Sequence, residues 1–256
     1  MAKKKHTPNF LPFVLAVLFL AGGEVYVTVP TLLPALVMAC PLINLAAAWW
    51  LAGQAKDEYW YNFFLLPTVS AWSIWALVTI SNQPWLIHGL LITGFVLFYL
   101  YWRYVFFFFY NQSRYLSFSL ENLSFYINLL TIFCLGSAAF GLRFFLSLHW
   151  WQFMPAVLVL LLVIVYQNFW AAKLEWQRAG HTWLVVSLLL GEMFFGLTLL
   201  PHDHNLLGLM WAVAYYVIIT LSNDWLTQQF KPFKAKVCLG ISLAAWVLLL
   251  ATAGWQ

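Results

Sequence analysis

The chain has 256 residues, of which 64% are in the apolar set AVILMFWYC and only 8% are charged, with a formal net charge of +4. An average soluble domain is roughly 45–50% apolar and about 25% charged, and a folded chain of this length leaves much of its surface exposed. The composition therefore excludes a soluble globular protein, a disordered chain and a nucleic-acid-binding protein, and it indicates that the lipid bilayer is the solvent.

Long apolar stretches follow one another along the whole chain. A transmembrane helix needs about 20 such residues, and nine stretches qualify: 10–29, 32–52, 63–80, 86–106, 123–145, 153–171, 182–200, 206–222 and 237–253. They are apolar on every face, which favours helices over the alternating strands of a β-barrel. We therefore predict an all-α, polytopic transmembrane helix bundle that forms a single integral membrane domain over 1–256, with no soluble domain.

Two stretches leave eight spans as an alternative. Residues 10–52 form nearly one apolar run, in which Pro30 and Pro34 predict a turn between two helices. Residues 98–110 hold ten aromatic side chains, so the fourth helix is able to continue past 106 along the membrane interface.

The basic residues predict an orientation. With a cytoplasmic N-terminus and nine alternating spans, only Arg143 of the twelve Lys and Arg falls on the outer side. The positive-inside rule requires a bias of this kind, so we predict a multi-pass protein of the cell membrane, the cytoplasmic membrane in a prokaryote. The cytoplasmic basic residues are then Lys3, Lys4, Lys5, Lys56, Arg103, Arg114, Lys173, Arg178, Lys231, Lys234 and Lys236.

Three ionisable residues lie in the predicted outer half of the membrane: Glu24, Arg143 and Glu192. A charge at membrane depth is costly and indicates a functional site by default, and an arginine fork matches a carboxylate. We therefore hypothesise that Arg143 pairs with Glu24 or Glu192. The neighbouring Gly23 and Gly191 would let the helices approach closely. The same set of charges also fits a purely structural clasp between helices.

The predicted outer loops carry further polar groups. His202, Asp203 and His204 follow the seventh span, and His149 precedes the sixth. Two histidines separated by one residue can share a divalent metal with a carboxylate or a third histidine. These four residues are therefore candidate ligands for a divalent metal, the one cofactor that the sequence suggests. In the alternative interpretation the loop is a solvated turn in which Asp203 or Asn205 caps the next helix.

The motifs leave the function open. The sequence contains no phosphate loop, dinucleotide-binding motif or nucleophile elbow, so it does not decide whether the protein is an enzyme. The outer location of the charges at depth favours a one-sided polar pocket that handles a lipid or small molecule at the outer leaflet. There, Glu24 or Glu192 would act as a general base and Arg143 as a phosphate clamp. A proton- or ion-coupled transporter and a structural or assembly subunit are the alternatives. Membrane lipids are the expected partners, and the oligomeric state is left open.

Overall fold

The computed structural model describes residues 10–53, 59–111, 114–115, 119–146 and 149–252. Within these ranges the chain forms helices and no strands, and nine helices are long and apolar enough to cross a membrane. The predicted all-α fold with nine spans is thereby confirmed. Lys3–Lys5, Lys56 and Gly254–Gln256, on which the orientation partly depends, lie outside the described residues, so the cytoplasmic N-terminus stays a prediction.

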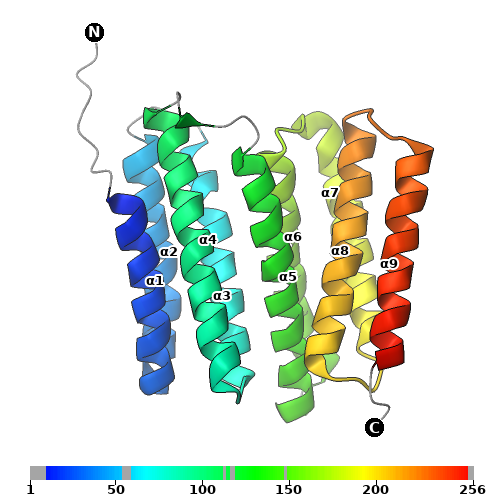
Figure 1. Ribbon diagram of the computed structural model, residues 1–256, viewed down its shortest axis with the longest axis horizontal. Helices are drawn as coiled ribbons and strands as arrows, with labels where there is room; N and C mark the ends of the chain where they lie inside the picture. Colours follow the sequence, from blue (N-terminus) through cyan, green and yellow to red (C-terminus); the bar gives the residue numbers. More distant parts are fainter. Residues whose placement is uncertain (1–9, 54–58, 112–113, 116–118, 147–148, 253–256) are drawn as a thin grey trace. The chain divides into compact units, whose positions relative to one another are not determined.

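The long helices follow the predicted order (Figure 1). They are α1 (Leu11–Thr28), α2 (Leu33–Ala48), α3 (Leu65–Ile80), α4 (Pro84–Tyr110), α5 (Ser119–Leu146), α6 (Trp150–Ala171), α7 (Trp176–Leu197), α8 (His204–Leu226) and α9 (Pro232–Thr252). Short helical turns adjoin three of them: η1 (Pro30–Leu32), η2 (Trp49–Gly53) and η3 (Trp60–Phe64).

Prolines define several helix starts. Pro12, Pro34 and Pro84 occupy the first two positions of α1, α2 and α4, where a missing main-chain N–H costs no helical hydrogen bond. Pro30 begins η1, which forms the predicted turn between the first two spans. The helix α4 continues to Tyr110 through the aromatic run, as the sequence allowed.

The chain divides into two compact units, Met1–Ile127 and Asn128–Gln256. That the two form one membrane domain stays a prediction. In the first unit, α1 packs along α4, and the two helices lie side by side in Figure 1. The ring of Phe19 on α1 lies directly against Gly94 of α4, so closely that a Cβ on Gly94 would collide with it. Phe19 stacks on Phe98 with ring centroids 4.3 Å apart, and on Trp75 of α3 at 5.8 Å.

In the second unit, α6 packs on α7, α7 on α8 and α8 on α9. Two glycines bring α5 and α8 together, since a Cβ on Gly136 would lie 2.7 Å from the Trp211 ring and one on Gly208 would collide with Ser137. Small residues permit such approaches in membranes, where close packing replaces the hydrophobic effect as the driving force. Trp211 is fully buried there, and its Nε1 donates to the Leu190 carbonyl at 3.0 Å.

Candidate functional site

Glu24 pairs with a histidine of the neighbouring helix. Its Oε1 lies 3.0 Å from Nδ1 of His88 on α4. The two side chains are 43% and 50% exposed, respectively. The two helices come close beside the pair, since Gly23 has no side chain. A Cβ there would collide with Leu91 of α4. The sequence pattern did not single out His88 as the partner. The signal for it was its position one turn after Pro84, at a depth comparable with that of Glu24 on the alternating topology.

Arg143 binds a helix end. From the last turn of α5, its Nη1 donates a hydrogen bond to the carbonyl of Thr198, the residue that follows α7. The last carbonyls of a helix lack partners within it and carry partial negative charge, which a guanidinium stabilises. A helix terminus therefore offsets part of the cost of this cation. Glu24 belongs to the first unit and Arg143 to the second, so their pairing stays a prediction.

Glu192 is exposed on α7 and forms no ion pair with Arg143 among the described residues. It lies at an apolar groove of about 310 Å³ between α6 and α7, which Leu158 and Phe195 also line. The two helices approach closely here, because a Cβ on Gly191 would lie 2.6 Å from Cδ2 of Leu158. Glu192 thus faces the groove, where the structure gives it no basic partner.

The loop from Pro201 to Asp203 ends in the residue that caps α8. One carboxylate oxygen of Asp203 accepts a hydrogen bond from the main-chain N–H of Asn205 at 2.9 Å, and the other lies 3.2 Å from Nδ1 of His204. The capping role that the sequence allowed for Asp203 is confirmed. His149 precedes α6, where its main-chain N–H donates to Gln152 at 3.0 Å. His202 lines a pocket of about 430 Å³ in the second unit.

These loop residues do not assemble into a metal centre in the part of the chain that the structure describes. No three His, Cys, Asp or Glu side chains lie close enough there to hold a metal ion. The predicted metal-ligand set of His149, His202, Asp203 and His204 is therefore not brought together as a site.

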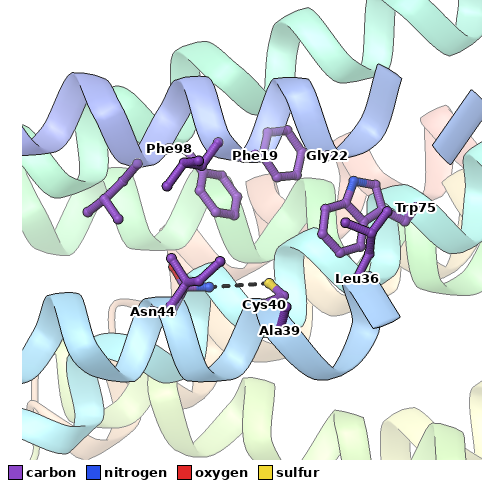
Figure 2. Close-up of a pocket in the computed structure, with 11 residues that line it drawn as sticks. Phe19, Gly22, Leu36, Ala39, Cys40, Asn44, Trp75 and Phe98 are labelled. Atoms are coloured by element: carbon purple, nitrogen blue, oxygen red, sulfur yellow. Dashed lines mark hydrogen bonds between the residues drawn. The ribbon is translucent and has the colours of Figure 1, made fainter. Parts of the chain in front are cut away.

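A cavity of about 50 Å³ lies among α1, α2, α3 and α4 (Figure 2). Its wall is mainly apolar and aromatic, and the Phe19, Trp75 and Phe98 rings form part of it. Leu18 of α1 and Ile43 of α2 also line the cavity, and they are 47% and 41% exposed. Because these two side chains are partly exposed, the cavity opens at the surface of the first unit.

Two polar side chains reach this cavity. The Asn44 amide nitrogen donates to Cys40 Sγ and to Thr68 Oγ1, each at 3.3 Å, and Figure 2 shows the first of these bonds. No donor among the described residues reaches the oxygen of that amide. The Nε1 atom of Trp75 is buried without a partner in the same set of residues. The wall of this otherwise apolar cavity therefore includes an amide oxygen that accepts no hydrogen bond from the described residues and a tryptophan whose indole N–H is buried without a partner among them.

The second unit holds a buried amide cluster that the sequence reasoning missed. Asn128 donates to Oε1 of Gln167 at 2.7 Å, and Asn223 donates to Oδ1 of Asn168 at 3.3 Å. The other amide atoms of Asn128, Gln167 and Asn223 are buried without a described partner. The signal was available in the sequence, because each amide interrupts an apolar helix.

No protein-family model, curated protein or solved structure matches the chain. The nine apolar helices fit a multi-pass membrane protein. Any narrower function has to be argued from the geometry of the two units.

Proposed function

We propose that the protein binds a lipid or another small apolar molecule from the bilayer in the cavity of the first unit, as part of lipid or small-molecule handling. The observation that carries the proposal is a cavity that aromatic rings line and that opens beside the exposed side chains of Leu18 and Ile43, on two helices apolar enough to cross a membrane. A molecule dissolved in the bilayer reaches such a cavity without crossing water.

The polar atoms of the cavity indicate the chemistry of the ligand. A buried polar atom without a partner costs roughly 1–3 kcal/mol, so the buried Trp75 N–H favours an occupant with a hydrogen-bond acceptor. The Asn44 oxygen, which accepts no hydrogen bond from the described residues, favours an occupant that also has a donor. A hydroxyl or amide group can accept from the indole and donate to the amide oxygen. The ligand class is therefore an apolar molecule with one small polar group.

The Glu24–His88 pair is the candidate for acid–base chemistry in this unit. Glu24 lies two residues beyond Gly22, which lines the cavity. A carboxylate hydrogen-bonded to an imidazole is a common arrangement for proton transfer. In the predicted orientation, the pair lies nearer the outer leaflet than the cavity.

A photoreactive lipid tests the binding proposal. The full chain is reconstituted with a phospholipid that carries a diazirine in its acyl chain, and labelled peptides are mapped by mass spectrometry. A Cβ at Gly22 has room, 3.5 Å from Leu36 and 3.6 Å from Trp75, so a leucine begins without a clash and extends into the cavity that Gly22 lines. We expect Gly22→Leu to lower labelling of α1 and α2 by about tenfold, the equivalent of roughly 1.4 kcal/mol.

The matched control is Gly240→Leu on α9, where an added Cβ meets nothing within 4 Å. This variant should label like the wild type. Equal labelling of α1 and α2 in Gly22→Leu and in the control would refute the cavity as the binding site. It would favour the structural or assembly subunit that the sequence also allows.

A second candidate, proton- or ion-coupled transport, is supported by the amide cluster of the second unit. On the predicted topology, Asn128, Gln167 and Asn223 lie toward the cytoplasmic ends of their helices, in the half without ionisable groups at depth. Buried amides with free atoms are typical of hydrated polar paths. Transport predicts proton or sodium flux into liposomes that Asn128→Leu abolishes, and the absence of flux in the wild type contradicts it.

A further inference from the structure

A second pocket of the first unit, about 200 Å³ in volume, lies where α4 ends and α1 begins. Arg103 near the end of α4, Arg114 in the turn beyond it and Pro12 in the first turn of α1 all line this pocket. It lies on the face where the chain enters its first helix, and that face is predicted to be cytoplasmic. The pocket is distinct from the cavity of the proposed function, and its argument does not depend on that function.

The α4 helix holds the Arg103 guanidinium in place from two sides. Its Nη1 donates to the Tyr99 hydroxyl at 2.9 Å. Its Cζ lies 5.5 Å from the ring centroid of Tyr99 and 5.3 Å from that of Phe107. A guanidinium has five N–H groups, so most of its donors are left for another molecule while its position is already restricted.

Main-chain hydrogen bonds hold Arg114 to the end of α4, beside the same pocket. The Asn111 N–H donates to the Phe107 carbonyl at 3.1 Å, and the Arg114 N–H donates to the Asn111 carbonyl at 3.0 Å. Arg114 is exposed and Asn111 is half-buried.

The two arginines have no acidic partner among the described residues. Neither forms an ion pair there, and no Asp or Glu lines the pocket. Two guanidiniums at one pocket repel each other unless an anion lies between them. Arginine is well suited to phosphate because its planar fork donates to two oxygens at once.

We propose that this pocket binds the phosphate of an anionic phospholipid from the adjacent leaflet. Two observations favour a lipid over a soluble phosphate. The pocket wall is partly aromatic, with Phe106 and Phe107 beside the arginines. In addition, Phe10 and Phe13 at the start of α1 are 64% and 53% exposed, so acyl chains have an apolar surface next to the headgroup site. Basic pockets of this kind on the cytoplasmic side are typical headgroup sites.

Native mass spectrometry of the detergent-solubilised full chain tests the proposal. The protein is titrated with phosphatidylglycerol and with phosphatidylcholine of the same acyl chains. We expect a clear preference for phosphatidylglycerol. Arg103→Ala and Arg114→Ala should each weaken its binding by about fivefold, as roughly 1 kcal/mol per basic residue implies. Arg103→Lys keeps the charge but loses the fork, so it should give a smaller but measurable loss.

The control is Arg178→Ala, which removes a basic residue that lies 3.8 Å from Glu175 and outside the pocket. It should bind phosphatidylglycerol like the wild type. An equal loss in Arg178→Ala, or equal affinity for the two lipids, would overturn the site. Displacement of phosphatidylglycerol by inorganic phosphate at equal concentration would overturn the assignment to a lipid. Arg114 is exposed, so the proposal stays testable through Arg114→Ala if Arg103→Ala fails to fold.

Discussion

Replacing Gly208 by alanine is expected to destabilise the second unit by about 2–3 kcal/mol, because it overfills the crossing of α5 and α8. The added Cβ would lie 2.7 Å from the main-chain nitrogen of Ser137 and 3.0 Å from the Phe133 carbonyl oxygen. Main-chain atoms of a helix cannot rotate away. The helices must therefore separate by about 0.7 Å before the nearest main-chain contact reaches an ordinary 3.4 Å.

The separation would weaken contacts along the whole crossing. A gap of 0.5–1 Å forfeits about a quarter to a half of the attraction between packed atoms, and Trp211 packs against Gly136 in the same interface. The loss should persist in a Ser137→Ala background, because that change removes the hydroxyl but leaves the main-chain contacts.

Reversible unfolding of the full chain in mixed micelles measures the effect, with Gly196→Ala on α7 as the control. An added Cβ at Gly196 meets nothing within 4 Å, so this variant should be equally stable or gain up to about 1 kcal/mol from helix propensity. Equal stability of the Gly208→Ala and Gly196→Ala variants would refute the close crossing of α5 and α8.

Two further substitutions test the polar contacts near the helix ends. Arg143→Met should lower the free energy of unfolding by about 1–2 kcal/mol, because it leaves the Thr198 carbonyl unpaired at the end of α7. Glu192→Gln should leave it unchanged, because Glu192 forms no ion pair with any residue that the structure describes. A larger loss in Glu192→Gln than in Arg143→Met would contradict the assignment. A double-mutant cycle of Glu24→Ala and His88→Ala should give a coupling energy of about 0.5–1 kcal/mol, and a coupling of zero would mean that the pair does not form in the membrane.

The spans were predictable because apolarity marks hydrocarbon depth directly. The helix ends were less so, as α4 shows. It begins at Pro84 and ends at Tyr110, beyond the predicted 86–106 at both ends. At the interface, water and headgroups satisfy the main chain, so composition stops constraining where a helix ends. The aromatic run through Phe109 showed only that the fourth helix was able to continue beyond residue 106.

The pairing of the charges could not be predicted for a different reason. A helix that is apolar on every face carries no pattern that reveals which side meets which neighbour. The sequence thus predicted the depth of Glu24 in the membrane but not that its side chain faces His88. The Arg143 contact to a main-chain carbonyl was further hidden because any helix end offers such a partner. Asn44 and Asn128 were overlooked although neutral amides inside spans are themselves a signal for polar contacts between helices.

The two ligand sites of the first unit share α1. Pro12 lines the arginine pocket, and Leu15, three residues further, lines the cavity. At 1.5 Å per residue, this separation is about 4–5 Å along the helix, shorter than an acyl chain. A phospholipid whose phosphate lies between Arg103 and Arg114 therefore has its chains at the level of the cavity opening near Leu18.

The combined variant Gly22→Leu/Arg103→Ala decides whether one lipid occupies both sites. With one ligand, filling the cavity removes contacts of the same molecule that the arginines bind, so Gly22→Leu alone should weaken phosphatidylglycerol binding. The loss of affinity in the double variant should then be smaller than the product of the two single fold-losses, because groups that contact one ligand are coupled. If Gly22→Leu leaves phosphatidylglycerol binding unchanged and lowers only the photolabelling of α1 and α2, the sites bind separate molecules. The two sites would then share only the helix α1 and no ligand.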